Sequence, residues 1–255
     1  MSAKERGETG RLRVGVSGAA GRMGRVTCGT VVADYDLILA AAIDPVFVDA
    51  GRGKVDTAAA APRFAALGEA LAAGDLDVIV DFTVPAAVKG NVLLCVENKV
   101  PVVVGTTGLS TADLAEIEGR ADAARVPVLV APNFALGAVL MMRFAEEAAK
   151  HFGACEIVEL HHADKIDAPS GTARLTQRRV EDVWREVGEG REVAVHSVRL
   201  PGLVAHQVVI FGGQGETLTI RHDSLSRESF MSGVILAIKR VRELQGLVVG
   251  LENIL

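Results

Sequence analysis

The sequence is poor in cysteine and has no excess of basic residues, and both shortages restrict the classes of protein it can encode. Its 255 residues include only three cysteines, Cys28, Cys95 and Cys155, an odd number at wide spacing. This pattern is typical of reduced thiols in a cytoplasmic protein rather than of a disulfide framework. The formal net charge is -5 at pH 7, so the chain has no general attraction for nucleic acid, and an anionic ligand needs a local site.

Long apolar runs are missing as well. The N-terminal residues 1–13 are polar, so we expect no secretory signal. The most apolar stretch, residues 126–142, is interrupted by Pro132, Asn133 and Gly137, and it is shorter than the ~20 apolar residues that cross a bilayer. With 49% hydrophobic and 23% charged residues, the chain nevertheless has the composition of a globular protein with a substantial core. We therefore expect one large or two modest domains and no membrane partner.

The first half alternates apolar strands with helices. Strands are expected over residues 12–17, 36–43, 76–83, 100–106 and 126–131, and helices over residues 22–33 and 110–125. Near-continuous apolar strands alternating with helices indicate an α/β domain with a parallel sheet covered on both faces. The carboxyl ends of such strands form the ligand crevice, and here each of them ends on small or polar residues.

The pattern changes after about residue 134. A long helical stretch to about residue 152 is followed by strands over residues 155–160, 193–200, 205–211 and 216–222, and a helix begins near Thr172. Three of these strands follow one another without long crossover helices, which indicates an α+β domain with an antiparallel or mixed sheet. We predict a dinucleotide-binding domain over residues 1–133 and a second domain over residues 134–233. The C-terminal residues 234–255, which include part of a helical stretch over 226–244, are expected to pack back on the first domain.

Residues 18–24, Gly-Ala-Ala-Gly-Arg-Met-Gly, form a G-x-x-G-x-x-G variant of the dinucleotide fingerprint. The motif follows a strand and opens a helix, as its mechanism requires. Glycines let the backbone approach a pyrophosphate, and the N–H groups and dipole of the helix start hold the anion. A plain strand-to-helix turn is the alternative interpretation.

Asp44 closes the second strand, at about the distance from the glycines where an acid binds the ribose hydroxyls. A carboxylate there disfavours a 2′-phosphate, whereas Arg22 in the loop could pair with one, so NADH and NADPH both stay open. Asp44 could alternatively be a turn former before Pro45. Phe82-Thr83 and Gly105-Thr106-Thr107-Gly108 lie at two further strand ends, where small residues would let a nicotinamide ring lie close to the backbone.

The densest polar cluster is residues 159–172, which leave one strand and enter a helix. Ser170, Gly171 and Thr172 form a helix start suited to a carboxylate. Lys165 adds a positive charge, and His161 and His162 titrate near neutrality, so we predict a pocket for an anionic substrate that needs proton transfer. A metal site is the rival interpretation, but adjacent histidines on a strand point to opposite faces and Lys165 would repel a cation, so we expect no metal.

On these residues the chain resembles the 4-hydroxy-tetrahydrodipicolinate reductase family, the dihydrodipicolinate reductases of bacterial lysine and diaminopimelate synthesis. The resemblance covers nearly the whole chain and is carried by residues 18–24, 105–108, 131–134 and 159–173. Its most specific part is the string His-His-x-x-Lys-x-Asp-Ala-Pro-Ser-Gly-Thr. Two departures are a short segment between Thr172 and Val193, and Asp44-Pro45 where some relatives carry Glu followed by Arg.

The resemblance implies a Rossmann domain joined to a mixed-sheet domain that assembles a cytoplasmic homotetramer. It implies reduction of a small dicarboxylate heterocycle, 4-hydroxy-tetrahydrodipicolinate, to tetrahydrodipicolinate with NADH or NADPH. His161 would be the acid/base and Lys165 the proton donor, while His162, Gly171 and Thr172 would bind substrate carboxylates. The implied cofactor contacts are Gly18, Ala19, Ala20, Gly21, Arg22, Met23, Asp44, Gly105, Thr106, Thr107, Ala131, Pro132, Asn133 and Phe134, to which the strand-end argument adds Phe82.

Two other functions compete with this hypothesis. An amino-acid or semialdehyde dehydrogenase of the same fold would share the glycine turn, but the His-His-x-x-Lys string argues against it. A non-enzymatic dinucleotide sensor would need no proton-donating cluster, and it should carry a DNA-reading or partner-binding module, which we do not find in the sequence.

Overall fold

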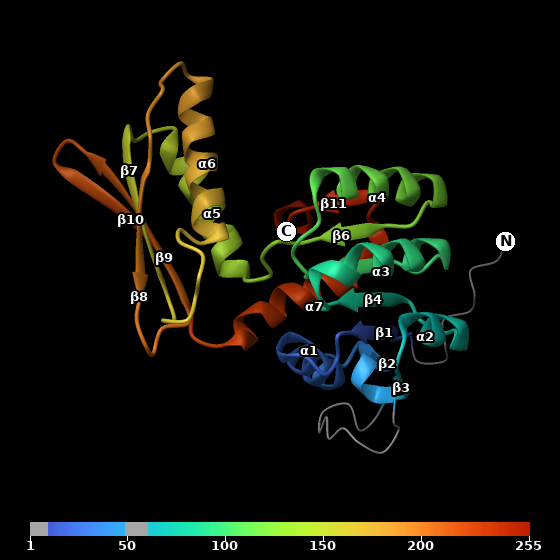
Figure 1. Cartoon of the computed structure of the whole chain (residues 1–255). Helices are drawn as coiled ribbons and strands as arrows, with labels where there is room; N and C mark the ends of the chain where they lie inside the picture. Colours follow the sequence, from blue (N-terminus) through green and yellow to red (C-terminus); the bar gives the residue numbers. More distant parts are fainter. Residues whose placement is uncertain (1–9, 49–60) are drawn as a thin grey trace. The chain divides into compact units, whose positions relative to one another are not determined.

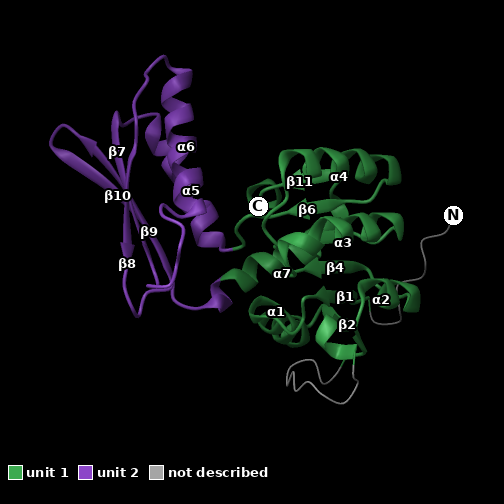
Figure 2. Ribbon diagram, in the orientation of Figure 1, with its two compact units in different colours: residues 1–134, 230–255 green, residues 135–229 purple. Residues whose placement is uncertain are grey.

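The computed structural model describes residues 10–48 and 61–255, which divide into two compact units. The first unit runs to Phe134 and resumes at Phe230–Leu255, whereas the second comprises Ala135–Ser229 (Figure 2). The first unit is therefore discontinuous, because the chain leaves it, builds the second unit and then returns.

The first unit is built on a seven-stranded sheet in which every pairing is parallel (Figure 1). Its strands are β1 (Leu12–Ser17), β2 (Leu37–Ile43), β3 (Arg63–Phe64), β4 (Val78–Asp81), β5 (Val102–Val104), β6 (Val128–Val130) and β11 (Leu247–Val249), in the spatial order β11-β6-β5-β4-β1-β2-β3. The predicted parallel α/β sheet is thus confirmed. The pattern did not predict β3 and β11, because two or three residues are too few to show a period.

Five helices accompany this sheet: α1 (Arg22–Ala33), α2 (Leu67–Ala73), α3 (Pro85–Glu97), α4 (Thr111–Ala124) and α7 (Met231–Arg240). Helices α2, α3 and α4 share one apolar core with the strands, in which Ile79, Val92 and Ile117 are fully buried. Helices α1 and α7 pack against each other. Because successive residues of a strand point to opposite sides, the apolar residues of the central strands are buried on both faces.

Short 3₁₀ helices complete the described elements: η1 (Pro45–Val48), η2 (Arg227–Phe230), η3 (Val241–Glu243) and η4 (Leu251–Ile254). The single helix expected over residues 226–244 is therefore divided into η2, α7 and η3. All three cysteines are buried free thiols, and burial raises the pKa of Cys28 and of Cys155 to about 12. Thiols with such a pKa are not reactive at neutral pH.

The second unit contains a four-stranded mixed sheet with the order β10-β9-β7-β8. The strands are β7 (Ala154–His161), β8 (Ala194–Arg199), β9 (Ala205–Gly213) and β10 (Glu216–Ser224), and the helices are α5 (Leu136–Ala149) and α6 (Gly171–Glu186). β7 and β8 are parallel, whereas β9 is antiparallel to β7 and β10. Because α6 crosses over between two parallel strands, the carboxyl ends of β7 and β8 meet at the same edge of the sheet.

Trp184 anchors α6 in the core of this unit. Its side chain is 2% exposed, and the indole N–H lies 3.0 Å from the Ala149 carbonyl oxygen and 2.9 Å from that of Phe152. The ring thus fixes α6 against the end of α5. This contact helps to set where α6 begins relative to the sheet.

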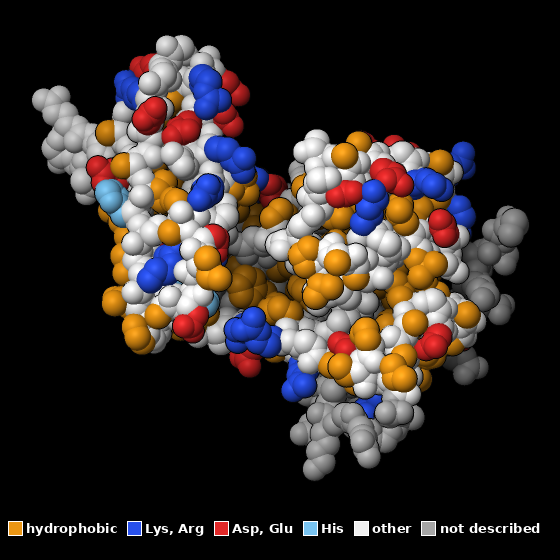
Figure 3. Space-filling model, in the orientation of Figure 1, with side chains coloured by type: hydrophobic (Ala, Val, Ile, Leu, Met, Phe, Trp, Pro, Cys, Tyr) orange, Lys and Arg blue, Asp and Glu red, His pale blue; other side chains and the backbone are white. Residues whose placement is uncertain are grey.

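Lysine and arginine side chains are interspersed with aspartate and glutamate over the faces seen in Figure 3. This mixture agrees with the small net charge of -5 and with the expectation that any anion is held locally. In the part of the chain that the structure describes, none of the helices combines the length and apolarity needed to span a bilayer.

Candidate functional site

The glycine-rich turn after β1 is folded so tightly that two of its positions accept only glycine. Gly18 has a φ of +80°, and a Cβ atom there would lie 2.3 Å from the carbonyl oxygen of Phe82. A Cβ atom on Gly24 would lie 2.0 Å from the carbonyl oxygen of Gly18. At Gly21 the corresponding distance is 3.1 Å. The first and third glycines therefore let the turn approach the end of β4 and let α1 approach the turn.

The start of α1 has free backbone donors. Gly18 and Ala19 donate their N–H groups to the Ile43 carbonyl at 2.9 and 3.0 Å, which fixes the turn to β2. Helix α1 then begins after Gly21, without a side-chain cap and without an acidic residue in its first turn. The first N–H groups of a helix, here from Arg22 onward, find no acceptor within the helix. Together with the positive end of the helix dipole, they can hold a phosphate.

Asp44 fastens the end of β2 to this turn. Its Oδ2 accepts the N–H of Ala20 at 3.0 Å, and its Oδ1 accepts the N–H of Val46 at 3.1 Å. The second bond is that of a turn former, the alternative interpretation from the sequence. A contact between Asp44 and a ribose stays a prediction, and it would have to be made by a carboxylate that already braces the backbone.

Asp81, which was not among the predicted site residues, joins three elements at the same edge of the sheet. It is fully buried. Its Oδ1 accepts the hydroxyl of Thr83 at 2.7 Å and that of Thr106 at 2.6 Å, and its Oδ2 accepts the side-chain amide of Asn91 at 2.8 Å. Asp81 therefore joins the ends of β4 and β5 to α3. The sequence did contain a signal for this residue, because Asp81 is a carboxylate at the end of an apolar strand, at the sheet edge where ligands bind.

The other predicted cofactor residues lie at the carboxyl ends of β4, β5 and β6. The rings of Phe82 and Phe134 meet edge to face with centroids 5.8 Å apart. A Cβ atom on Gly105 would lie 2.1 Å from the ring of Phe82, so this glycine lets β5 end against the aromatic pair. In this group Ala131, Phe134 and Thr106 are buried, Asn133 is half-buried, and Thr107 and Pro132 are exposed.

In the second unit, β7 ends with Glu159 and His161 on one face of the sheet, two residues apart. The side chain of Glu159 has no exposed surface, whereas that of His161 is 14% exposed. The Nδ1 atom of His161 contacts Oε2 of Glu159. Because Nδ1 is held in this way, Nε2 is the ring nitrogen available to a ligand.

Arg199, at the end of β8, lies opposite His161 in the parallel register. Its Nη2 and Nη1 donate to Oε1 and Oε2 of Glu159 at 2.7 and 2.9 Å, a fork that engages both carboxylate oxygens. The sequence predicts the strand but not the role of this residue. The local pattern leaves the sheet antiparallel or mixed, and only a parallel β7–β8 pair brings the carboxyl ends of the two strands together.

The loop between β7 and α6 carries the other predicted reaction residues. The Nζ atom of Lys165 lies 2.6 Å from Oδ1 of Asp167, and the lysine side chain is 22% exposed. His162 is exposed, and the peptide bond between Ala168 and Pro169 is cis. His161, His162 and Lys165 thus come from one strand end and the loop that follows it.

Ser170 caps α6, which begins at Gly171 as the sequence indicated. Its hydroxyl oxygen accepts the N–H of Ala173 at 3.2 Å, and its own N–H donates to Oε1 of Glu159 at 3.2 Å. Ser170 is 3% exposed, so it supports the helix start from inside. Gly171 is exposed and Thr172 is half-buried, and they present the positive end of α6 at the surface.

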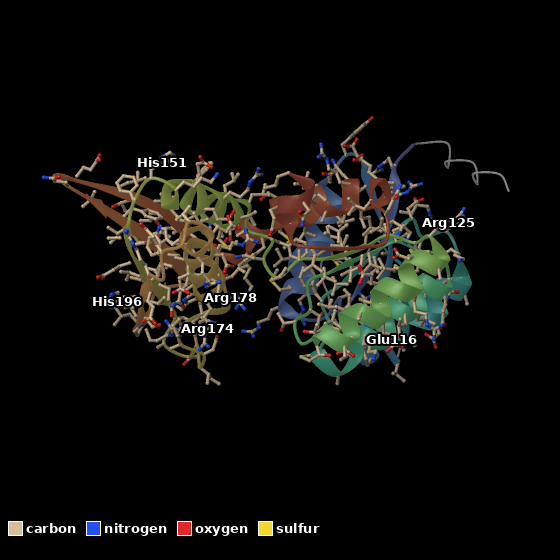
Figure 4. The ribbon with its side chains drawn as sticks, turned by 90° about the horizontal axis from the view of Figure 1, so that it is seen from above. Glu116, Arg125, His151, Arg174, Arg178 and His196 are labelled. Atoms are coloured by element: carbon tan, nitrogen blue, oxygen red, sulfur yellow. The ribbon has the colours of Figure 1, made fainter. Side chains whose placement is uncertain are left out.

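Arg174 fixes the loop from the other side. Its guanidinium donates to the carbonyl oxygens of Pro169 and Ala168 at 3.0 and 3.2 Å. Figure 4 shows it one helical turn from Arg178 on α6. The loop that carries Lys165 is therefore tied to α6 as well as to β8.

Burial and charge have opposite effects on the titratable groups of this cluster. Burial lowers the pKa of His161 and outweighs the contact with Glu159, which raises it. Burial raises the pKa of Glu159, but hydrogen bonds from Arg199, Ser197 and His161 bring it below its ordinary value. The ion pair with Lys165 likewise lowers the pKa of Asp167. At neutral pH Glu159 is therefore ionised and His161 neutral, with Nδ1 as the protonated nitrogen.

Across residues 10–48 and 61–255, no three side chains of histidine, cysteine, aspartate or glutamate are grouped so that they could hold one ion. The cluster instead combines a neutral histidine, a lysine and a helix start, which can bind an anion and exchange a proton.

Comparison with known proteins gives the same family for both halves of the chain. Residues 12–134 match the family described as dihydrodipicolinate reductase, N-terminus, and residues 137–255 match dihydrodipicolinate reductase, C-terminus. The chain is 47% identical to a 4-hydroxy-tetrahydrodipicolinate reductase of Moorella thermoacetica, over 96% of this chain and 98% of the relative.

Solved structures agree with the sequence comparison. A dipicolinate-bound dihydrodipicolinate reductase from Paenisporosarcina sp. TG-14 is 38% identical, with a TM-score of 0.86 over 96% of this chain and all of the other. A scyllo-inositol dehydrogenase from Lactobacillus casei with bound NAD(H) and scyllo-inositol has a TM-score of 0.67 at 12% identity, over 96% of this chain and 93% of the other. The latter likeness shows the fold alone.

Proposed function

Because the chain belongs to the dihydrodipicolinate reductase family, we propose that it reduces 4-hydroxy-tetrahydrodipicolinate to tetrahydrodipicolinate, with NADH or NADPH as the reductant. The observation that supports this most strongly is the continuous match of both halves of the chain to one family of reductases. The reaction consumes a hydride and a proton and releases water, and it belongs to lysine and diaminopimelate synthesis, so we also propose a cytoplasmic location.

The first unit fits a nicotinamide dinucleotide. The uncapped start of α1 and the turn closed by Gly18 and Gly24 support a pyrophosphate at residues 18–23. The strand ends at Asp44, Phe82, residues 105–107 and residues 131–134 would contact the rest of the cofactor. When bound, the reduced nicotinamide supplies the hydride.

The choice between NADH and NADPH depends on the groups near the ribose. Asp44 is a carboxylate and would repel a 2′-phosphate, whereas Arg22 at the start of α1 would attract one. We propose that the protein uses both cofactors and that Asp44 favours NADH.

The second unit supplies the binding site for an anionic ring. The Paenisporosarcina relative binds dipicolinate, a ring with two carboxylates. Here the exposed Gly171, Thr172 and the buried cap Ser170 form a helix start that can hold one carboxylate. Lys165 and His162 offer a positive charge and a donor for the other. Lys165 is paired with the exposed Asp167, so a substrate carboxylate would have to displace that partner.

His161 and Lys165 are the groups that can move the proton. Nδ1 of His161 is held by Glu159, so a proton would enter or leave the ring at Nε2. Lys165 is cationic and can stabilise negative charge that develops on the ring nitrogen side of the substrate, or donate a proton to it. We therefore assign His161 as acid/base and Lys165 as proton donor.

The open face of the second unit's sheet supports assembly. Val158, Leu160, Val208 and Ile210 alternate with core residues on β7 and β9, and they are half-buried on the face that α5 and α6 do not cover. A sheet face of this kind suits contact with further copies of the chain. We propose a homotetramer, which light scattering at several protein concentrations would test.

The reaction itself is tested by following the absorbance of reduced nicotinamide while a synthase generates the unstable substrate in place. Purified protein should consume NADH or NADPH only when the synthase is active, and His161→Gln should reduce the rate. A folded sample that binds the cofactor but consumes neither form would refute the proposed function.

A further inference from the structure

The guanidinium of Arg199 is extensively hydrogen-bonded within the second unit. Two of its N–H groups form the fork to Glu159. The others donate to backbone oxygens: Nε to Lys165 at 3.3 Å, Nη2 to Asp167 at 2.8 Å and Nη1 to Val198 at 2.8 Å. An arginine has five N–H donors, and here all five have an acceptor within the protein.

Glu159 is the complementary centre of acceptors. One carboxylate oxygen, Oε1, accepts from Arg199 and from the N–H of Ser170 at the start of α6. The other, Oε2, accepts from Arg199 and contacts Nδ1 of His161. A carboxylate with no exposed surface stays ionised only when it is paired and hydrogen-bonded in this way. The pair thus touches the histidine, the lysine loop and the helix start at once.

The backbone pairing of the sheet does not depend on these two side chains. β7 and β8 are joined by backbone hydrogen bonds along a register of six residue pairs. A buried ion pair of this kind is often no more stabilising than an apolar pair of the same size. The position of this ion pair, at the end of the two strands next to the reaction residues, therefore suggests a role other than stability.

We propose that Glu159 and Arg199 are positioning residues that hold His161 in one tautomer and hold the backbone of Lys165 and Asp167 in place for the reaction. This proposal rests on the proposed function for the identity of the reaction, but its first test does not. Glu159 fixes the imidazole so that Nε2 faces the ligand. Arg199 fixes Glu159 and the loop, so that one buried pair aligns both groups that exchange protons.

The charges around His161 determine what each substitution does. Burial is the largest influence and lowers the pKa of His161, the anion of Glu159 raises it, and the cations of Lys165 and Arg199 lower it. Glu159→Gln removes the only one of these groups that raises the pKa. Arg199→Lys keeps the positive charge but replaces a five-donor fork by a single ammonium group. Glu159→Gln therefore tests the electrostatic role of the pair, and Arg199→Lys tests its geometric role.

The first measurement is a long-range ¹H–¹⁵N NMR spectrum of the full chain labelled at its six histidines, with His161→Gln used to assign the signals of His161. In the wild type at neutral pH, His161 should be the Nδ1-protonated tautomer. In Glu159→Gln this preference should be lost, and the pKa of His161 should fall further, because the anion that raises it is gone. The signals of the exposed His151, which lies before the opposite end of β7, serve as an internal reference and should not move.

The second measurement is turnover across the pH range. Arg199→Lys should lower kcat by about 10–100-fold while the His161 tautomer is kept. The loop loses hydrogen bonds to the guanidinium, and a displacement of Lys165 by a fraction of an ångström or more misaligns it for the reaction. Two matched controls repeat the same substitutions away from the site. Glu147→Gln removes the acid of an exposed pair with His151 at the end of α5, and Arg185→Lys alters an exposed pair with Asp182 on α6. Both should keep kcat within about twofold.

A wild-type spectrum in which His161 carries its proton on Nε2 would overturn the proposal, whether or not any variant folds. So would an Arg199→Lys variant that keeps full kcat, or a Glu159→Gln variant whose His161 tautomer is unchanged. The spectra need no turnover. A chain with the expected spectra but no reductase activity would therefore refute the proposed function and leave the positioning pair intact.

Discussion

Replacing Gly24 by alanine should weaken dinucleotide binding and destabilise the first unit, because the added methyl group has no room. Its Cβ atom would lie 2.0 Å from the carbonyl oxygen of Gly18, 2.7 Å from the carbonyl carbon and 2.8 Å from the Cα atom of Ala19. All three are backbone atoms, so no side chain can turn aside. Ordinary contact begins at 3.4 Å, and 3.4 Å minus 2.0 Å leaves about 1.4 Å by which α1 and the turn must separate.

The magnitude follows from two opposing effects. Overpacking costs about 1–3 kcal/mol, and a backbone overlap this large belongs at the upper end. Alanine recovers about 1 kcal/mol through its higher helix propensity. The net loss of about 2 kcal/mol corresponds to a fall in Tm of about 4–8 °C for a chain of this size. Displacing a charge-assisted hydrogen bond at the helix start by this separation should raise the Kd of the dinucleotide at least about tenfold.

Two other glycines provide matched controls. Gly90 and Gly119 lie inside α3 and α4, and a Cβ atom at either would meet nothing within 4 Å. Gly→Ala at these positions should raise the free energy of unfolding by about 0.5–1 kcal/mol and leave the Kd unchanged. Thermal unfolding and calorimetric titration with NADH would measure all three variants. If Gly24→Ala unfolds and binds like Gly90→Ala, the steric argument for the turn is wrong.

Asp44→Asn keeps one acceptor for the turn but removes the negative charge, so the ratio of NADPH to NADH use should rise several-fold in steady-state assays. An unchanged ratio would leave Asp44 as a turn residue only. Thr172→Val should mainly raise KM, and Lys165→Met should mainly lower kcat, by about 10²–10⁴-fold. The assignment of Lys165 fails if the second variant changes KM alone. Burial lowers the pKa of His222, with Asp223 acting in the opposite direction, so the unfolded chain binds more protons than the folded one below about pH 6.5. The free energy of unfolding therefore decreases as the pH falls through this range. Thermal unfolding should show that His222→Gln loses less stability between pH 7 and pH 5 than the wild type does. Carboxylates, in contrast, cause losses of stability below about pH 4.5.

Much of the first unit could be predicted from the sequence because its strands are buried on both faces. Uninterrupted apolar runs such as residues 12–17 carry a strong signal, and the fingerprint glycines mark the turn that follows. The limits are equally physical. Strands of two or three residues, such as β3 and β11, have no period to detect, and the role of Asp81 depends on partners in β5 and α3 that are distant in sequence.

The reaction cluster could be recognised in the sequence as a polar segment, but most contacts between its side chains could not be predicted. Alternation on β7 already places Glu159 and His161 on the same face, so their contact could have been inferred. The contribution of Arg199 could not have been inferred, because it depends on β8 running parallel to β7, and the local sequence pattern left the direction of β8 open. For Ser170, the sequence motif predicted the start of the helix. Its burial, in contrast, could be seen only in the folded structure.

The discontinuous first unit has a consequence for synthesis on the ribosome. β6 ends at Val130, and its outer neighbour β11 begins at Leu247, so the partner of this strand is translated more than a hundred residues later. At about 5–20 residues per second, β6 is without that neighbour for roughly 5–25 seconds in every nascent chain. A bare strand edge is a template for pairing with other chains. The second unit, contiguous at Ala135–Ser229, is made entirely within that interval, and slow codons placed in it would prolong the time during which chaperones must shield the unfinished sheet.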